Sequence, residues 1–317
     1  MVKRLFAVPQ AGIAVALITT IAIFQLVNPV FLSSANIVVM LRASAYVGII
    51  AVGMALCLMS GVLDLSVGAT AGLASILAAE AMTKLAAPLW LGLVIAVAAG
   101  ITVGMLNAIL IIRFQLNAFI ATIATSFVVR GLASWICTGW SVYPLPPGVQ
   151  EFGAIRPLGI SFAFWAMILA MAIAMWILGY TVLGLEIRAT GSDRESARCT
   201  DVNVNKVNAI CLLIVGGLAG LSGLLLTILI NAGTPTLGSG WELTIITACV
   251  IGGVSLNGYE GSMPGLLLGL LFLQVIQNGI VMIGLSAYLQ PVAVGLILVV
   301  SMVFDTRRRK FLNLEKL

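Results

Sequence analysis

The chain alternates between long apolar runs and short polar breaks. A helix needs about 20 predominantly apolar residues to cross the roughly 30 Å hydrocarbon core of a bilayer. We therefore expect an all-α integral membrane protein with about ten transmembrane helices, formed as a single domain over residues 1–317. The runs 43–60 and 65–80 are short, so one or two helices are expected to be broken or re-entrant. The predicted spans are 7–27, 43–60, 65–80, 89–112, 118–138, 162–179, 207–230, 243–258, 263–284 and 289–304.

The composition favours lipid as the solvent of this chain. Of its 317 residues, 61% are hydrophobic and 9% are charged, whereas soluble domains contain about 45–50% apolar and about 25% charged residues. The chain has no histidine, which removes most metal sites and the nucleophile pairs that depend on histidine. It also lacks the G-x-x-x-x-G-K-[ST] loop that cradles the phosphates of ATP. We therefore expect no catalytic residue, no metal site and no cofactor, and the chain is not expected to be an enzyme.

Basic residues collect at the ends of the apolar runs, where they set the orientation of a membrane protein. This placement argues against nucleic-acid binding, although the net charge is +5. If the N-terminus is inside, twelve basic residues face the cytoplasm and three face outward, which predicts that both termini are cytoplasmic. The inner segments include a mixed-charge loop at about 180–206 and a basic tail at 305–317. The inner residues are Lys3, Arg4, Arg113, Arg188, Arg194, Arg198, Lys206, Arg307, Arg308, Arg309, Lys310 and Lys316, and the outer ones are Arg42, Lys84 and Arg156.

A polar break at residues 60–68 carries Asp64 within an otherwise apolar region. An aspartate at the centre of a membrane helix costs about 2.5–3.5 kcal/mol on insertion scales. A helix break that places Asp64 or Ser66 at a new N-cap lowers this cost, because the side-chain oxygen then accepts from free backbone N–H groups. Two interpretations stay open: a cap and turn at the inner interface, or a broken helix beside the translocation path.

Two further patterns concern helix packing. Glycines recur four residues apart at Gly68/Gly72, Gly100/Gly104, Gly216/Gly220 and Gly265/Gly269. Small residues at this spacing let helices approach closely in lipid, so we assign these pairs to packing. The order of helix, glycine-rich break and helix also occurs twice in the same direction, at 43–80 and at 245–284, which suggests an internal repeat.

Neutral polar side chains are the third feature of the apolar runs, and they include Asn107, Asn117 and Asn278. Asparagine offers both donors and acceptors, which suits a neutral polyhydroxylated cargo. Each of these residues equally suits a hydrogen bond between helices. The chain lacks the scattered buried carboxylates and histidines of a proton relay, which weighs against a proton-driven transporter.

From residue 45 to residue 305 the chain resembles the ribose/arabinose/xylose-type inner-membrane permeases of bacterial carbohydrate ABC importers, which are binding-protein-dependent permeases. The resemblance rests on motifs that occur in the order found in that family. They are GVLDLSVG at 61–68, NAFIAT at 117–122, Arg130-Gly131, GSGWEL at 238–243, VIGGVSL at 250–256 and QNG at 277–279. The loop at 189–204 is similar to the family's cytoplasmic pattern, from which Ser192, Asp193, Ser196 and Asp201 depart, and Thr244 departs from another motif.

The resemblance implies a permease subunit in the bacterial inner membrane, a multi-pass protein that imports a monosaccharide or similar neutral polyol. It implies three partners besides membrane lipid: a cytoplasmic ABC ATPase, a periplasmic sugar-binding protein and a second permease subunit, identical or different. The expected residues for coupling to the ATPase are Gly191, Asp193, Glu195, Ala197 and Arg198. The expected residues of the translocation pathway are Asp64, Ser66, Asn107, Asn117, Glu242, Asn257 and Asn278. An ion-coupled secondary metabolite transporter is the alternative function.

Overall fold

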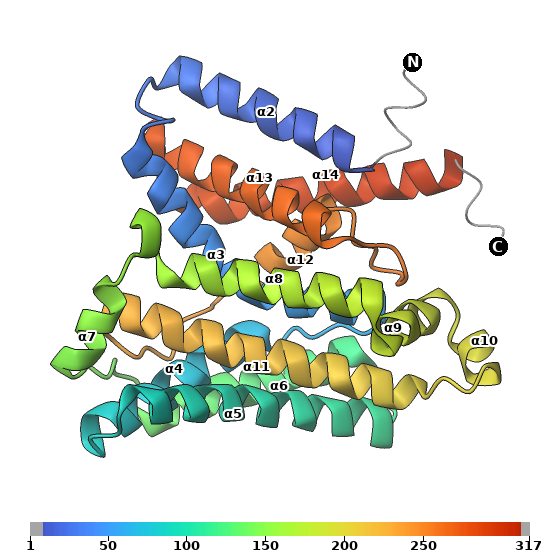
Figure 1. The fold of residues 1–317 in the computed structure, drawn as a ribbon, viewed down its shortest axis with the longest axis horizontal. Helices are drawn as coiled ribbons and strands as arrows, with labels where there is room; N and C mark the ends of the chain where they lie inside the picture. The colour runs from blue at the N-terminus through green and yellow to red at the C-terminus, as the bar shows by residue number, and fades with distance from the viewer. Residues whose placement is uncertain (1–8, 312–317) are drawn as a thin grey trace.

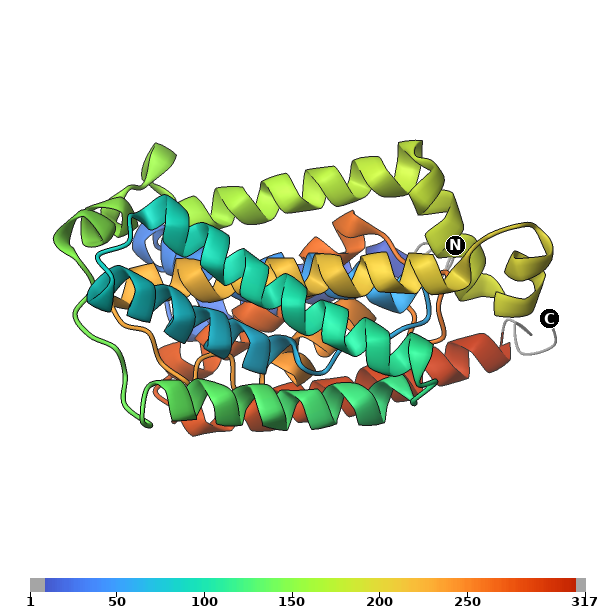
Figure 2. The ribbon, with the colours of Figure 1, turned by 90° about the horizontal axis from the view of Figure 1, so that it is seen from below.

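The computed structural model describes residues 9–311, and the regular secondary structure of this part of the chain is helical apart from an isolated bridge between Val142 and Gly233. The long helices run along one axis of the molecule, with α7 at one end and α9 and α10 at the other (Figure 1, Figure 2). We call these the α7 end and the α10 end. The long helices are α2 (Pro9–Val27), α3 (Ser34–Met59), α4 (Val67–Lys84), α5 (Leu89–Ala108), α6 (Ala118–Ile136), α8 (Phe162–Tyr180), α11 (Val204–Ile230), α12 (Trp241–Ile251), α13 (Met263–Met282) and α14 (Gln290–Phe311). The shorter elements are η1 (Ile109–Arg113), α7 (Pro147–Ala154), η2 (Pro157–Gly159), α9 (Val182–Ser192), α10 (Arg194–Cys199) and η3 (Ala287–Leu289).

Within residues 9–311, six helices are long and apolar enough to cross a membrane. They are α3, α5 together with the π-helical turn η1, α6, α8, α11 and α13. The apolar stretches of α2, α12 and α14 are shorter, at 10–17 residues, and α4 with 18 residues is not among the six. The all-α prediction is therefore confirmed for the described residues, and each predicted run overlaps a helix, although the run 243–258 extends beyond the end of α12. Six of these helices meet the length and hydropathy of a span.

The helix that is too short to cross a membrane is α12, and not the run 43–60 as the sequence suggested. Helix α3 begins at Ser34 and has 26 residues, so the run 43–60 is part of a full-length helix and the expectation that it is short is wrong. Its true start is set by Ser33, whose side chain accepts a hydrogen bond from the backbone N–H of Asn36 at 3.3 Å. Helix α12 has only 11 residues, so it is about 16 Å long. That length is about half of the hydrocarbon core.

A non-helical segment, residues 231–240, connects α11 to this short helix. The backbone N–H of Thr234 donates to Ser75 Oγ of α4 at 3.2 Å, and Gly238 packs against Gly68 of the same helix. As the segment advances, its neighbours on α4 run backward from residue 75 to residue 68. The segment therefore follows α4 from the α7 end into the bundle, and α12 starts where the segment ends.

The helices form two units of four that repeat in opposite directions. The helix contacts of one unit have counterparts in those of the other. The contacts of α4 with α5 and α6 correspond to those of α12 with α13 and α14. The contacts of α11 with α4 and α5 correspond to those of α3 with α12 and α13. Helices α3 and α11 pack against each other in antiparallel register: Ser222 Oγ donates to the carbonyl oxygen of Tyr46 at 2.7 Å, and Gly53 packs on Val215. The contacts thus relate α3–α6 to α11–α14, the inverted arrangement of many transporters, rather than pairing α3–α4 with α12–α13 in one direction.

Small residues allow the closest helix contact in the molecule, between α5 and α11. A Cβ atom placed on Gly100, Gly104, Gly216 or Gly220 would overlap backbone atoms of the facing helix. The contacts, in order along α5, are Ala96 with Gly220, Gly100 with Gly216, and Gly104 with Leu212. Gly72 likewise packs on Pro235, Gly265 on Gly252, and Gly269 on Ala248. The assignment of the glycine pairs to packing is confirmed.

We predict that Gly216→Ala lowers the free energy of unfolding by about 1–3 kcal/mol, the usual cost of overpacking a closely packed contact. The matched control is Gly131→Ala in α6, where an added Cβ atom has no neighbour within 4 Å. This control should gain up to about 1 kcal/mol from helix propensity. Thermal unfolding of both variants in detergent measures the difference. Equal stability of the two variants would show that the α5–α11 contact is not a tight one.

Candidate translocation and coupling site

The break between α3 and α4, residues 60–66, holds a buried carboxylate. Asp64 is 1% exposed, and its Oδ1 atom accepts from the backbone N–H of Ser66 at 2.8 Å and from the hydroxyl of Ser66 at 2.6 Å. The Nδ2 atom of Asn107 on α5 donates to Asp64 Oδ1 at 3.1 Å and to Ser66 Oγ at 2.8 Å. These contacts define the Asp64 cluster, formed by Asp64, Ser66 and Asn107. The cluster joins the start of α4 to the end of α5.

The geometry of the break follows from the way α3 ends. Gly61 adopts a positive φ of 77°. Its N–H donates to the carbonyl oxygen of Leu58 at 2.9 Å, and the N–H of Val62 donates to that of Cys57 at 2.9 Å. This pattern is a Schellman motif, which terminates a helix at a residue with left-handed backbone geometry. Helix α12 ends in the same way at Gly253, which explains why the two regions look alike in the sequence.

The start of α4 matches the cap expectation only in part. Ser66 occupies the N-cap position, and its carbonyl oxygen accepts from the backbone N–H of Thr70 at 2.8 Å. Its side chain makes no cap hydrogen bond, because the hydroxyl binds Asp64. Asp64 instead closes an Asx-turn on the N–H of Ser66. The buried Asp64 carboxylate and the polar groups of Ser66 are thus paired within the protein, as a buried or membrane environment requires.

Two buried amide oxygens, one within the Asp64 cluster and one on α11, have no protein partner. They are Oδ1 of Asn107 and Oδ1 of Asn208, whose residues are 0% and 5% exposed. The α5–α11 contacts pair residue 104 with residue 212 and advance by one turn each time, so the next turn places residue 208 opposite residue 108. The two amides therefore lie at the same level of the bundle, where a buried water can satisfy such groups.

Glu242 joins this region from the other half of the molecule. It lies in the first turn of α12, where the helix dipole favours a negative charge. Its carboxylate lies against Gly68, two residues beyond Ser66: a Cβ atom on Gly68 would be 2.7 Å from Oε2 of Glu242. Four of the seven expected pathway residues, namely Asp64, Ser66, Asn107 and Glu242, thus gather around the start of α4.

The other three expected pathway residues make separate contacts. Asn117 is exposed and caps α6 by accepting from the N–H of Phe119 at 2.9 Å. Asn257 is exposed in the loop 252–262. Asn278 on α13 and Asn36 on α3 exchange two amide hydrogen bonds of 2.9 and 3.0 Å. No hydrogen bond joins these three to the Asp64 cluster within the described residues, and the Asn36–Asn278 pair acts between helices.

The expected coupling loop forms two short helices, α9 and α10, at the α10 end. Asp193 caps α10: its Oδ1 accepts from the N–H of Glu195 at 3.0 Å, and its Oδ2 accepts from the hydroxyl of Ser196 at 2.6 Å. The Ser196 hydroxyl and then the Glu195 N–H lower the pKa of Asp193 below its ordinary value. A lowered pKa means that the ionised cap persists above this value and is lost only as the pH falls through it.

Gly191, at the end of α9, is wedged between two helix breaks. A side chain there would overlap the carbonyl oxygen of Met59 and approach the backbone nitrogen of Tyr259, and Gly258 packs on Gly191 from the other side. The N–H of Tyr259 in turn donates to the carbonyl oxygen of Met59 at 2.9 Å. The end of α3, the end of α9 and the loop 252–262 therefore meet at one point.

Arg194 adds a second link between the coupling helices and the break after α3. Its Nη2 atom donates to the carbonyl oxygen of Gly61. Among the expected coupling residues on α10, Ala197 is buried, whereas Glu195 and Arg198 are exposed. Arg194 was not among the expected coupling residues, because no local sequence pattern indicates a contact with a carbonyl 133 residues away.

Gly61 and Gly258 were not selected either. Both have positive φ angles, of 77° and 95°, and both lie in glycine-containing breaks that follow an apolar run. A glycine just past the last residue of a helix is the usual signal for such a cap. That signal could have identified the two turns, but it could not have shown that α9 and α10 contact them.

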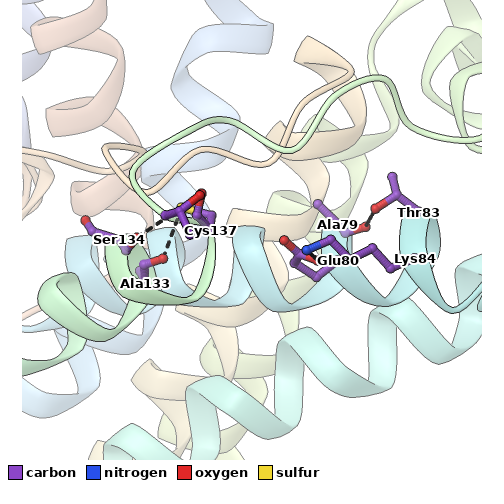
Figure 3. A network of polar contacts seen from close by, with 8 residues as sticks. Ala79, Glu80, Thr83, Lys84, Ala133, Ser134 and Cys137 are labelled. Carbon is purple, nitrogen blue, oxygen red and sulfur yellow. Dashed lines mark hydrogen bonds and ion pairs between the residues drawn. The ribbon is translucent and has the colours of Figure 1, made fainter.

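At the α7 end the polar contacts are more local. Lys84 Nζ lies 2.7 Å from Glu80 Oε2 within the last turn of α4, and Cys137 Sγ donates to the carbonyl oxygen of Ala133 at 3.2 Å in α6 (Figure 3). One longer link is Arg130 of α6, whose Nη1 donates to the carbonyl oxygen of Pro235 at 3.3 Å. This contact holds the segment 231–240 against the bundle. It also gives the charged side chain of Arg130 a hydrogen-bond acceptor within an otherwise apolar helix.

Comparisons with known proteins agree with the architecture. Residues 36–302 match the family described as branched-chain amino acid transport system / permease component. The chain is 32% identical over 298 residues to the ribose import permease protein RbsC of Haemophilus influenzae, covering 92% of this chain and 91% of that protein. It is 33% identical to RbsC of Bacillus subtilis (94% and 93% covered) and 31% identical to the L-arabinose ABC transporter permease protein AraH of Azospirillum brasilense (95% and 88% covered).

No solved structure matches the chain. The resemblance to ribose- and arabinose-type permeases is confirmed by these relatives. The relatives and the six candidate spans together make the chain a multi-pass inner-membrane protein. All the relatives named above are transport permeases, which agrees with the expectation of a non-enzymatic chain.

We predict that Asp64→Ala lowers the free energy of unfolding by about 1–3 kcal/mol, because buried donors of Ser66 and Asn107 lose their shared acceptor. Asp64→Asn keeps an oxygen at this position and should lose less. The midpoints of thermal unfolding in detergent compare the two variants with the unchanged chain. The account of the Asp64 cluster fails if the alanine variant is as stable as the asparagine variant.

Proposed function

Because this chain belongs to the family of branched-chain amino acid transport system / permease components, we propose that it is the membrane subunit of an ABC importer. Its cargo is a monosaccharide or a similar neutral polyol, which it admits to the cytoplasm. The names of the relatives, ribose import permease and arabinose transporter permease, support a sugar as cargo. The neutral amide of Asn107 and the hydroxyl of Ser66 in the Asp64 cluster suit hydroxyl groups, since they both donate and accept.

The observation that carries this proposal is the docking of α9 and α10 on two helix breaks. A cytoplasmic ATPase that grips these helices can act on the break 60–66 through Arg194 and on the loop 252–262 through Gly191. The exposed charges of Glu195 and Arg198 offer this ATPase a surface. ATP-driven closure then moves α9 and α10, and with them the start of α4 and the residues around it.

Two further partners complete the assembly. A periplasmic sugar-binding protein delivers cargo to the α7 end, and a second permease subunit, the same or a different chain, encloses the path together with this one. Membrane lipid covers the remaining apolar side chains, many of which are exposed in the single chain, for example Phe127 on α6 and Leu296 on α14.

For the topology we propose ten crossings, with the α10 end and both termini in the cytoplasm. Helices α2, α4 and α14 add three crossings to the six long helices, and segment 231–240 together with α12 makes the tenth. The distribution of charge supports this orientation, since basic residues prefer the cytoplasmic side. In the described part of the chain the α10 end carries Arg113, Arg188, Arg194, Arg198 and Lys206, whereas the α7 end carries Arg42, Lys84 and Arg156.

An ion-coupled secondary metabolite transporter is the alternative function, and one observation favours it. Asp64 is a buried carboxylate whose hydrogen-bond donors are the neutral groups of Ser66 and Asn107. Buried carboxylates of this kind occur on ion pathways. Uptake by reconstituted protein separates the two functions. The ABC function requires ATP, the ATPase and the binding protein, whereas uptake that persists without the ATPase and collapses with the proton gradient establishes the alternative.

We predict that exchanging the charges at Asp193 and Arg198 (Asp193→Arg with Arg198→Asp) reduces sugar uptake about tenfold or more, because misplaced charges at a docking surface weaken it. Membrane insertion should be unchanged, since both side chains are exposed. Arg113→Asp, at an exposed position of the same end, is the control. Normal uptake by the double variant would mean that the loop 180–206 is only a connection.

We predict that a membrane-impermeant maleimide labels Cys199 in inverted vesicles but not in intact cells. Cys199 is exposed, whereas the other four cysteines are buried, so labelling reports on one site without further substitutions. Mass spectrometry of the labelled peptide identifies that site. Labelling of Cys199 from outside intact cells would overturn the orientation.

A further inference from the structure

Arg194 is the first residue of α10. Its main chain belongs to this helix, whereas its side chain contacts the turn that follows α3. The preceding Asp193 starts the helix as its N-cap. The guanidinium leaves the helix and donates to the carbonyl oxygen of Gly61. The contact therefore connects α10 to a segment that belongs to the membrane bundle.

The Gly61 carbonyl is free to accept this hydrogen bond because of the way α3 ends. In the Schellman motif at residues 57–62, the carbonyl oxygens of Cys57 and Leu58 accept from Val62 and Gly61. The Gly61 carbonyl takes no part in these bonds, so it can accept from outside the turn. The guanidinium has five donors in a rigid planar fork, which makes it a suitable partner for such an oxygen.

Three residues further along the chain is Asp64, whose contacts with Ser66 and Asn107 fix the start of α4 and the end of α5. A continuous series of contacts thus runs from α10 through Arg194 and Gly61 to the Asp64 cluster. Since the turn at Gly61 has a fixed hydrogen-bonded geometry, a displacement of α10 is passed on to the break 60–66.

We propose that Arg194 is a positioning residue of the transport cycle, which couples the movement of α10 to the start of α4 through the Gly61 carbonyl. This inference rests on the proposed function, because the ATPase supplies the movement. It assigns to Arg194, which is exposed like Glu195 and Arg198, a contact within the permease rather than a contact with the ATPase. Arg194 acts on the cargo site only through Gly61 and touches no cargo.

The test measures sugar uptake and ATP hydrolysis by the complete transporter (permease, ATPase and binding protein) in proteoliposomes. For Arg194→Ala we expect assembly with the ATPase and ATP hydrolysis within about twofold of the unchanged complex. The amount of sugar imported per ATP should fall about tenfold, the size of effect expected from losing one hydrogen bond to a charged group. Arg194→Lys should restore a large part of this ratio, because an ammonium group can also donate to the carbonyl.

Two further variants separate this role from direct docking. Gly61→Ala disturbs the turn, because alanine is strained at a φ of 77°, and it leaves the exposed surface of α10 unchanged. It should lower the sugar-to-ATP ratio as Arg194→Ala does. Arg113→Ala removes an exposed arginine from the same end of the bundle and should leave the ratio unchanged.

The inference is overturned if Arg194→Ala imports as much sugar per ATP as the unchanged complex, or if it acts by weakening assembly with the ATPase while Gly61→Ala has no effect. If Arg194→Ala does not assemble with the ATPase, the other two variants decide. The inference is supported if Arg194→Lys keeps most of the sugar-to-ATP ratio and Gly61→Ala lowers it. Any other pair of results overturns the inference. A failure of the proposed function looks different, since the unchanged complex would then show no ATP-dependent uptake at all.

Discussion

Lipid offers no hydrogen-bond partner to a peptide group, so a membrane helix can be interrupted only where the protein itself supplies the partners. Among residues 9–311, three non-helical segments between bundle helices meet this requirement in different ways, at residues 60–66, 231–240 and 252–262. In the first, Asp64 binds the N–H of Ser66 and the amide of Asn107. In the second, Ser75 and Arg130 bind the main chain of Thr234 and Pro235. The packing of the molecule follows from this requirement, because each break must lie against a helix that can satisfy it.

The same requirement connects the fold to transport. A non-helical segment is a point at which the helices that it joins can move relative to each other, and two of the three breaks are touched by α9 and α10. Gly191 fits between Met59 and Tyr259, and Arg194 holds Gly61. The contacts that make these turns acceptable in the bundle are therefore also the contacts through which an ATPase is proposed to act. The close α5–α11 packing, in contrast, contains no such break, because small residues bring the two backbones together along their length.

Much of the architecture could be predicted from the sequence because its cause is local. Apolar runs located the helices, and glycines spaced four residues apart located the close contacts. The start of α3 was missed because polar residues such as Asn36 and Arg42 interrupt its first turns. The half-length of α12 was missed because apolar residues such as Val254 and Leu256 continue the run beyond Ile251, where the helix ends. The inverted relation between α3–α6 and α11–α14 depends on contacts between distant helices, which no local pattern records.

The candidate site was predictable to a similar degree. Asp64 stood out because an acid in an apolar region is costly, and its neighbours Ser66 and Asn107 were selected with it. The bonds of Asn278 to Asn36 could not be told from a cargo contact by residue type, since an amide serves both purposes. Arg194 was passed over among neighbouring charges, because only the three-dimensional structure shows which of these exposed side chains donates to the Gly61 carbonyl.

The central claim is that α9–α10 and the break 60–66 move as one body when the ATPase acts. Spin labels on the native exposed Cys199 and on Leu63→Cys measure the distance between them in the assembled transporter, without nucleotide and with bound ATP. The account predicts that this distance stays the same, while the distance from Cys199 to a label at the exposed Trp140 of the α7 end changes. A Cys199–Leu63 distance that changes with ATP during normal import would contradict it.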